Sequence, residues 1–489
     1  MMKMMKKLMG LALVVSVFFT GIFASCVNAE EIFEAEYPFA YPMPDQADYL
    51  LENGEFDYDA YDKAYEKWAE TDRNDPLLFA GDEQLSAYFK SISKEMLTAK
   101  DQKNKVISPV NIYLALSMLS EITDGGTRDE ILNVLGADSI ESLRYRANRI
   151  FLSVYKNDGQ TVSVPASSVW LRNDMEYKKD ALSILADKYF ASSFSGEMGS
   201  DAYNQMIRKW LVDQTGGLLK EQAEKISLDP ETVIALASSL YFKAGWSSEF
   251  SKANTKTDIF HAHLGDVPGE FMYKSSTDTY YWSDRFGAVA LPMTNGGRMW
   301  IVLPDEGTAA ESLFESDEIQ NLIKSPAEWE NKKRLIVHKA IPKFDVAGEN
   351  DLIGALRNLG VMSVFDKNTS DFSPLTDIPE LSVSKVQHDA RVKIDEEGVE
   401  AAAYTVITVL AASMRPPEEE MEFVADRPFA FVITSQDNLP LFSGIVNEPE
   451  KGDKDRVRPE VGLSVNQNKK NGEGFVFLSI YLIFCGSFS

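Results

Sequence analysis

The chain has 489 residues, of which 44% are hydrophobic, and a formal net charge of −26 at pH 7. This length and composition allow a large buried core, and one large fold with appendages is the simplest arrangement. The negative charge argues against a nucleic-acid partner, because a phosphate backbone requires a basic surface.

Residues 1–29 have the layout of a secretory signal peptide. Three lysines precede the apolar run LMGLALVVSVFFTGIF, and small residues lead to Ala29, so we predict export. Two forms of the mature chain stay open, because FASC at residues 23–26 resembles a bacterial lipoprotein box. Cleavage after Ala29 discards Cys26, whereas processing before Cys26 makes it a lipidated N-terminus. The second cysteine, Cys485, lies near the other end, so no disulfide framework is expected in the core.

Residues 30–79 form an acidic segment that is rich in tyrosine and phenylalanine. We predict a spacer or a partly ordered arm that lies on the core, with a binding arm as the alternative. Residues 80–450 carry the regular apolar patterns of a folded domain.

Three helices are predicted at the start of that domain. Apolar residues recur at helical spacing between Pro76 and Ala99. Pro109 indicates the start of a second helix, since proline fits the first helical turn. Thr127 and Glu130 have the spacing of a capping box and open a third helix that ends at Gly136.

Further along the chain, strands predominate. Residues 162–171 alternate as a strand does, and residues 233–250 form a long apolar run that ends in aromatic residues. Residues 289–304 indicate two strands around the turn Asn295-Gly296-Gly297, and residues 352–365 indicate a helix.

Residues 393–429 contain a strand-forming run that is too long for an ordinary strand. Past Gly398 the run consists of small and β-branched residues with almost no charge. From Gly398 to Ala412 it would span roughly 50 Å at about 3.4 Å per residue. It ends at Arg415-Pro416-Pro417 and a cluster of carboxylates, Glu418 to Glu420 and Glu422, which cannot join a sheet interior. An insertable strand is therefore attached to a solvated, strand-breaking segment.

Alternation divides this run into two faces, since residues two apart share a face of a strand. One face is small or apolar throughout and consists of Val399, Ala401, Ala403, Thr405, Ile407, Val409 and Ala411. The other face carries Glu400 and Tyr404 and suits a partly covered surface. A permanent buried strand is the alternative interpretation of the pattern, and the length of the run favours insertion.

Residues 451–489 form a C-terminal extension. It is polar until it turns apolar at Phe475 to Phe484, and this apolar run is too short to cross a bilayer as a helix. The pattern assigns no function to the extension.

The segment EEGVEAAAYT, from Glu396, resembles the hinge of the serpins. These protease inhibitors expose a reactive-centre loop and insert it into their own central sheet after cleavage. Val399 stands where the family usually has a hydroxyl residue, and Tyr404 ends the small residues one position early. Further segments resemble family motifs in the same order, from about residue 80 to residue 450: SPVN at 108–111, SSLYFKAGW at 238–246, IPKF at 341–344, PFAF at 428–431 and LFSG at 441–444.

The resemblance implies an α+β fold, with helices around a large central sheet, further sheets and an exposed reactive-centre loop within residues 393–429. It assigns the hinge to Glu396, Gly398, Val399, Glu400, Ala401, Ala402 and Ala403. It assigns a polar cluster under the middle of the sheet, the shutter, to Ser108, Asn111, Ser238 and His388. It assigns a contact at the top of the sheet, the breach, to Trp246, Lys343 and Glu396.

The resemblance further implies a monomeric suicide-substrate inhibitor of serine proteases, with no enzyme activity and no cofactor. A cut about fifteen residues after Gly398 would lie at Ala412–Ser413, consistent with the length of the run. A small residue before the cut suits an elastase- or subtilisin-like protease. Met414–Arg415 is the second candidate bond, for a chymotrypsin-like protease.

Two other functions stay open: a non-inhibitory binding protein with the same fold, and an exported surface-binding protein that uses the acidic arm and tail. A hydrolase is not predicted, because the sequence has no G-x-S-x-G elbow, H-E-x-x-H motif or phosphate loop. His261 and His263 predict a strand with outward histidines rather than a metal site, since no cysteine or acidic partner lies at ligand spacing.

Overall fold

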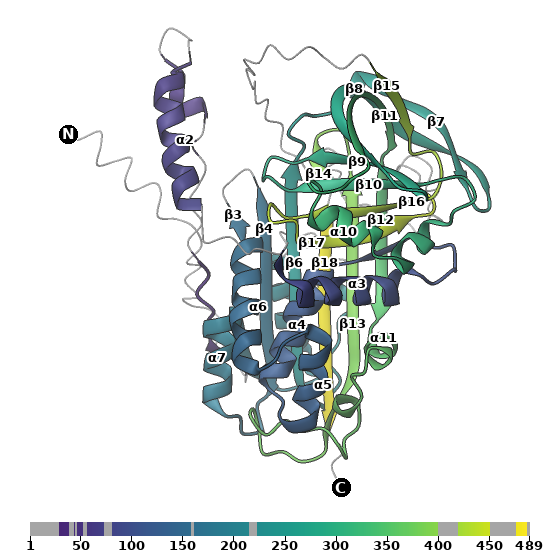
Figure 1. The fold of residues 1–489 in the computed structure, drawn as a ribbon. Coiled ribbons are helices and arrows are strands. Elements are labelled where there is room, and N and C mark those ends of the chain that lie inside the picture. The colour runs from purple at the N-terminus through teal and green to yellow at the C-terminus, as the bar shows by residue number, and fades with distance from the viewer. Residues whose placement is uncertain are drawn as a thin grey trace, which may run out of the picture.

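The computed structural model of the chain describes residues 29–38, 44, 46–51, 56–72, 81–157, 161–214, 223–399, 419–449 and 476–486. Within these residues, two sheets of nine strands each are combined with helices (Figure 1). The predicted α+β architecture is confirmed.

The central sheet carries most of the predicted site. Its strands lie in the order β1-β5-β4-β6-β18-β13-β12, with β3 paired to β4 and β14 paired to β6. Strands β4 and β5 are parallel, and the other neighbours in this order are antiparallel. The bounds are β1 (Glu30–Phe33), β3 (Lys156–Asn157), β4 (Val162–Arg172), β5 (Ala191–Gly196), β6 (Thr232–Gly245), β12 (Phe344–Asp351), β13 (Leu381–Ile394), β14 (Gly398–Val399) and β18 (Val476–Gly486).

The second sheet lies across the upper half of the molecule in Figure 1. Its order is β15-β11-β8-β9-β10-β16-β17-β2, with β7 paired to β8. The bounds are β2 (Lys105–Ile107), β7 (Thr255–Ala262), β8 (Gly265–Trp282), β9 (Phe286–Pro292), β10 (Arg298–Pro304), β11 (Lys332–Pro342), β15 (Glu420–Val424), β16 (Phe429–Thr434) and β17 (Pro440–Val446).

Helices pack on both faces of the central sheet. Ile234 and Leu236 of β6 belong to the main core cluster with α4, whereas Ala235 and Ala237 pack with Trp170 and helix α8. Burial on both faces explains why β6 reads as a continuous apolar run. The helices are α2 (Tyr58–Asp72), α3 (Glu83–Leu97), α4 (Pro109–Glu121), α5 (Gly125–Leu135), α6 (Ile140–Val154), α7 (Lys179–Tyr189), α8 (Asp201–Gln214), α10 (Glu318–Lys324) and α11 (Ile353–Asn358).

Most of the predicted elements are present. The predicted first helix is α3, the helix begun by Pro109 is α4, and the strand pair around Asn295-Gly296-Gly297 is β9 and β10. The long central strand is β6, but it ends at Gly245 rather than near Phe250. Trp246 forms only an isolated bridge to Met293 instead of continuing the strand.

Two helix predictions were wrong in detail. Helix α5 begins at Gly125, two residues before Thr127, and its N-cap Asp124 makes no side-chain cap bond. Glu130 instead accepts the backbone N–H groups of Met362 and Ser363 at 2.7 and 2.8 Å, so tertiary contacts replace the expected capping box. The helix predicted over residues 352–365 is α11 followed by a separate 3-10 turn at Ser363–Phe365, since the chain turns at Gly360 with φ +102°.

The N-terminal arm contributes to the core domain. β1 extends the central sheet beside β5. Tyr37 stacks on Phe151, Tyr155 and Phe190, and burial raises its pKa. The first part of the arm therefore lies on the core, and a 3-10 turn at Gln46–Tyr49 and then α2 follow along the chain.

The predicted strand-breaking acidic segment ends before Glu420, where strand β15 begins. Glu420 and Glu422 belong to β15, an edge strand that pairs with β11 alone among the described strands. Their side chains are exposed, whereas the side chain of Phe423 in the same strand is buried and belongs to the main core cluster. Carboxylates therefore fit this strand because it lies at an edge.

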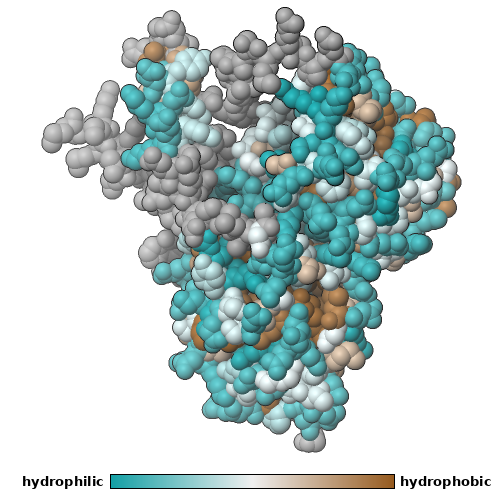
Figure 2. Space-filling model, viewed as in Figure 1, coloured by the Kyte–Doolittle hydropathy of each residue, from teal (hydrophilic) through white to brown (hydrophobic). Residues whose placement is uncertain are grey.

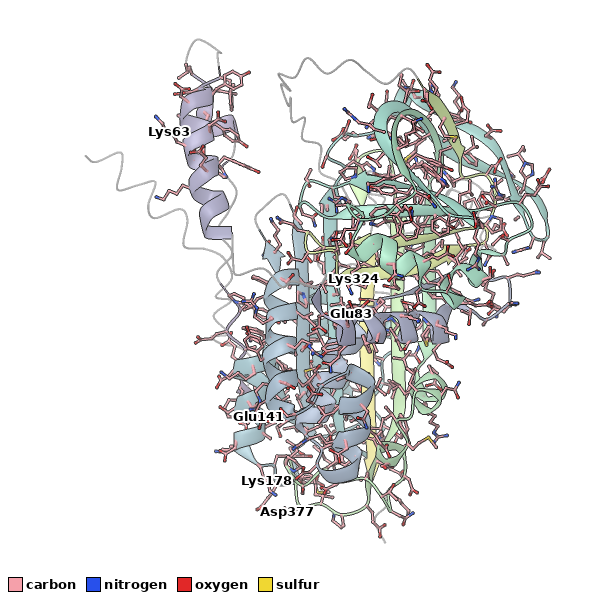
Figure 3. The ribbon with its side chains drawn as sticks, in the orientation of Figure 1. Lys63, Glu83, Glu141, Lys178, Lys324 and Asp377 are labelled. Atoms are coloured by element: carbon pink, nitrogen blue, oxygen red, sulfur yellow. The ribbon has the colours of Figure 1, made fainter. Side chains whose placement is uncertain are left out.

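Ion pairs connect the elements at the surface. Glu83 of α3 pairs with Lys324 of α10 at 2.8 Å, and both are labelled in Figure 3. Figure 2 shows that this face of the molecule is mostly hydrophilic, with an apolar area in its lower half. Among the described residues, we find no helix with the length and apolarity needed to cross a membrane.

Candidate functional site

The hinge lies against the end of β6. Gly398 pairs with Gly245 and Val399 pairs with Ala244. A Cβ atom on Gly398, which has φ +156°, would lie 2.5 Å from the carbonyl oxygen of Ala244, so only glycine permits this approach. The side chain of Val399 is fully buried. The first residues of the hinge are thus already part of the central sheet.

The residues before Gly398 form a tight turn that is bound to the breach. The indole N–H of Trp246 donates to the carbonyl of Asp395 at 2.9 Å, and the backbone N–H of Trp246 donates to Glu397 O at 3.0 Å. The carboxylate of Asp395 accepts the N–H groups of Glu397 and Gly398. These bonds hold the turn that directs the chain from β13 into β14.

Glu396 is the buried anion of the breach. Its side chain is 7% exposed, and Lys343 Nζ lies 3.3 Å from a carboxylate oxygen. The hydroxyl of Thr255 donates to Glu396 at 2.6 Å. Burial alone would raise the pKa of Glu396, but the bonds from Thr255 and Lys343 outweigh it, so the pKa lies below its usual value. Trp246, Lys343 and Glu396 therefore lie together, as the resemblance implies.

Replacing Lys343 with Glu should loosen the hinge. The substitution would leave Glu396 and Glu270, both within 3.4 Å of Lys343 Nζ, beside a third carboxylate. An uncompensated buried charge costs about 1–3 kcal/mol or more. We expect the lifetime of the native monomer at 37 °C to shorten several-fold, measured by size-exclusion chromatography over time.

Lys252→Glu is the matched control for this prediction. Lys252 pairs with the neighbouring hinge residue Glu397, but its side chain is 70% exposed. Exposed pairs contribute roughly 0–1 kcal/mol, so the control monomer should persist almost as long as the parent. Equal lifetimes for the Lys343→Glu variant and the parent would contradict a role of the breach in holding the hinge.

The four residues assigned to the shutter form one buried hydrogen-bonded cluster. Ser108 caps α4 by accepting the N–H of Asn111 at 3.3 Å, and its own N–H donates to His388 Nε2 at 3.0 Å. The hydroxyl of Ser238 donates to Asn111 Oδ1 at 2.5 Å, and Asn111 Nδ2 donates to Ser238 O at 3.4 Å. The cluster thus joins α4 to both β6 and β13.

His388 is held neutral in this cluster. It is fully buried, and burial lowers its pKa to about 3. Since Nε2 accepts a bond from Ser108, the proton of the neutral ring is on Nδ1, which finds no partner among the described residues. A protonated ring would carry a charge into a site that has no anion hydrogen-bonded to it.

Comparison with known proteins identifies the family. The family model described as serpin (serine protease inhibitor) matches residues 86–449, which is most of the chain. The chain belongs to the serpin family. It is 31% identical over 371 residues to Serpin-Z1C of Triticum aestivum, an alignment that covers 71% of this chain and 90% of that protein.

Other serpins support the same assignment. The leukocyte elastase inhibitor of Equus caballus is 27% identical, with 75% of this chain and 100% of that protein covered. The crystal structure of the thermophilic serpin tengpin in its native state matches with a TM-score of 0.65 at 28% identity, covering 75% of this chain and 95% of tengpin. The matched region of this serpin lies inside the predicted domain of residues 80–450.

Part of the predicted serpin site lies outside the described residues. This applies to Glu400, Ala401, Ala402 and Ala403 of the hinge and to the candidate bonds Ala412–Ser413 and Met414–Arg415. Their positions in the loop stay predictions.

Strand β18 is the part of the site that the sequence analysis missed. It lies between β6 and β13, and Ile480 at its middle pairs with Ser238 on one side and His388 on the other. The serpin shutter residues therefore flank the centre of β18. Its run of β-branched and aromatic residues is a strand signal, but we tested that run only as a membrane helix.

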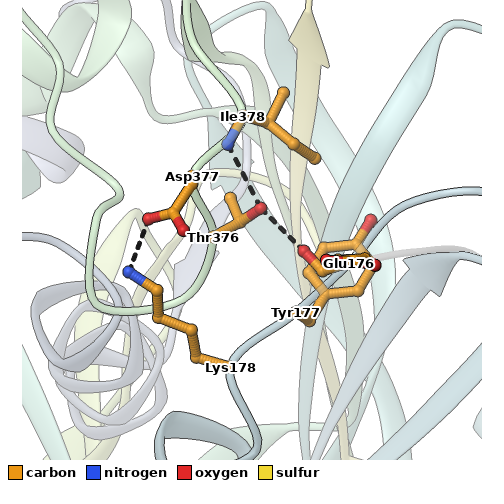
Figure 4. Close-up of a pocket in the computed structure, with 6 residues that line it drawn as sticks. All are labelled: Glu176, Tyr177, Lys178, Thr376, Asp377 and Ile378. Carbon is orange, nitrogen blue, oxygen red and sulfur yellow. Dashed lines mark hydrogen bonds and ion pairs between the residues drawn. The ribbon is translucent and has the colours of Figure 1, made fainter.

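Two further features of the described residues are the predicted histidine pair and a polar pocket. His261 lies in β7, one residue before its end, and pairs with Asp266 at 2.7 Å, whereas His263 lies in the following turn rather than in the predicted strand. No group of three metal ligands occurs among the residues that the structure describes. A pocket of about 250 Å³ lies near the beginning of β13 (Figure 4). Lys178 and Asp377 form an ion pair of 2.6 Å at its edge, and Thr376 donates to Glu176 O at 2.9 Å, so the pocket is a polar junction between two loops of the serpin domain.

Proposed function

We propose that this serpin is a suicide-substrate inhibitor of serine proteases of elastase or subtilisin type. The family model that matches the chain is described as serine protease inhibitor, and the hinge sequence is small and uncharged on the face of Val399, Ala401 and Ala403. The buried, paired position of Val399 carries the proposal, because it supports entry of the hinge into the central sheet with its apolar face inward.

The register of β14 supports a cut at Ala412–Ser413. Gly398 pairs with Gly245, where β6 ends. If the ladder continued along β6, Ala411 would lie opposite Thr232, where β6 begins. The loop up to Ala411 therefore matches the length of β6, and the proposed bond lies just beyond it.

The proposed mechanism uses the nucleophile of the protease. The serine oxygen of the protease attacks the carbonyl carbon of Ala412, an ester bond forms, and the peptide bond breaks with the amine of Ser413 as leaving group. The freed loop then inserts as a strand and carries the attached protease with it. Distortion of the protease prevents water from hydrolysing the ester. The native state in this mechanism is kinetically trapped.

Export and a monomeric state are part of the proposal. The pattern of residues 1–29 supports export, with a free and a lipidated N-terminus as the two forms. A charge of −26 favours repulsion between copies of the chain and supports a soluble monomer.

An elastase and a subtilisin-like protease test the proposal directly. We expect a complex that survives SDS, together with a released C-terminal fragment that begins at Ser413 by mass spectrometry. A protease whose serine is chemically blocked is the control and should give neither product. A fragment beginning at Arg415 would move the bond to Met414–Arg415, and cleavage without a stable complex would contradict inhibition.

A further inference from the structure

The space between β6 and β13 is filled by the C-terminal extension. β18, residues Val476–Gly486, is antiparallel to both neighbours and pairs with them along most of its 11 residues. It is the yellow strand at the centre of the sheet in Figure 1. The central sheet therefore contains a strand that comes from after the serpin domain.

β18 occupies the same row of the sheet as the hinge. Val399 pairs with Ala244, and Val476 pairs with Phe242. Only Lys243 of β6 lies between these two pairs. If the hinge continued past Val399 in its present register, Glu400 would lie opposite Lys243, and Ala401 would meet the position that Val476 occupies.

The two segments also run in the same direction and offer the same alternation. In both, residue numbers rise as the paired residue number of β6 falls. The positions that the loop would fill with Ala401, Ala403, Thr405 and Ile407 are those of Val476, Leu478, Ile480 and Leu482. By residue type, the sequence of β18 at these positions is as apolar as that of the loop or more so.

We propose that the space between β6 and β13 is a strand-binding site whose ligand is residues 476–486 of this chain. The C-terminal strand and the reactive-centre loop then exclude each other. The mutual exclusion rests on the proposed inhibitory function, whereas the strand-binding site does not. Loop insertion requires β18 to leave, so a resting inhibitor with β18 bound becomes fully active when its C-terminal strand is displaced or removed.

A disulfide trap tests the strand position without a protease. Cys485 is the ladder partner of Ser382 in β13. Directly opposite residues in an antiparallel pair have Cα atoms about 4.5–5.5 Å apart, within the usual range of about 4.4–6.8 Å for disulfides. We expect Ser382→Cys, in a Cys26→Ser background, to form a disulfide with Cys485 on mild oxidation, identified by mass spectrometry of the digest.

The oxidised chain should form the SDS-resistant complex with an elastase at least tenfold more slowly than the same sample after reduction. Ser382→Cys combined with Cys485→Ser is the control, and its rate should not depend on oxidation. Absence of the disulfide would overturn the strand position. A disulfide with an unchanged rate of complex formation would overturn the mutual exclusion.

Truncation provides a second measurement that does not depend on inhibition. In a chain that ends at Pro449, the backbone amides of β6 and β13 that face the space between these strands should exchange hydrogen for deuterium at least tenfold faster than in the full chain. A chain that ends at Gly486 should exchange these amides as slowly as the full chain. Unchanged exchange in the shorter chain would overturn the proposal. If the disulfide and the exchange results hold while no variant inhibits any protease, the proposed function fails and the strand site stands.

Discussion

We expect replacement of Ala401 with Arg to convert the proposed inhibitor into a substrate. Val399 is buried and paired with β6, and in a strand that continued in this register Ala401 would share its face. Insertion would bury the guanidinium without a partner, which costs several kcal/mol, and each 1.4 kcal/mol is a factor of ten. We expect the yield of SDS-resistant complex to fall at least about tenfold while cleaved chain accumulates, as measured on denaturing gels.

Ala402→Arg is the matched control for this prediction. In the same continued strand Ala402 would share the opposite face with Glu400, where we expect long side chains to reach solvent. We expect it to keep most of the complex yield. Cleavage should raise the melting temperature of the parent and of Ala402→Arg but not of Ala401→Arg. Equal complex yields for the two variants would contradict insertion in the register that β14 shows.

The second large effect is a loss of stability in mild acid caused by His388. Its pKa is lowered from 6.5 to about 3 in the folded protein by burial. The unfolded chain therefore binds the proton more strongly, so this contribution is fully present above pH 6.5 and is lost as the pH falls toward 3. Between pH 8 and pH 5 the free energy of unfolding should fall by about 2 kcal/mol through this group.

Urea unfolding of the parent and of His388→Gln at several pH values measures this loss. The difference between the two curves should narrow by about 2 kcal/mol from pH 8 to pH 5, because other titrating groups are common to both. His261→Gln is the control, since the hydrogen bond and charge of Asp266 raise the pKa of the exposed His261. The stabilising contribution of His261 is present below pH 6.5 and is lost as the pH rises. The difference in free energy of unfolding between the parent and His261→Gln should therefore change with pH in the opposite direction. A constant difference between parent and His388→Gln would show that the ring charges without cost.

Much of the site could be predicted from local sequence. The hinge was recognised by its resemblance to a family motif of consecutive residues, which here includes Glu396, Gly398 and Val399. A motif of consecutive residues can be recognised without any long-range information. Ser108 and Pro109 indicate a helix start in the same way, and the structure confirms the cap. The breach and shutter assignments came from resemblance to the family, because no spacing along the chain relates Ser108 to His388.

The errors arose where tertiary contacts outweigh local signals. Thr127 and Glu130 have the spacing of a capping box, but Glu130 gains more hydrogen bonds from Met362 and Ser363 than from its own helix. The prediction that Glu420 and Glu422 belong to a strand-breaking segment was wrong, because both lie in β15, an edge strand that leaves their carboxylates outside the sheet interior. Local patterns contain no information about which edge of a sheet is free.

The sequence by itself determined that this chain has a serpin domain and a long run of alternating small and apolar residues, because the family motifs and the alternation are local properties. Only the tertiary structure decided what lies between β6 and β13. An apolar run such as residues 476–486 predicts a strand, but its partner depends on which strands of the folded sheet have unpaired backbone groups. In this structure the C-terminal extension pairs with β6 and β13, the two strands between which the inserted reactive-centre loop would lie. Ile480 of the extension pairs with Ser238 on one side and with His388 on the other.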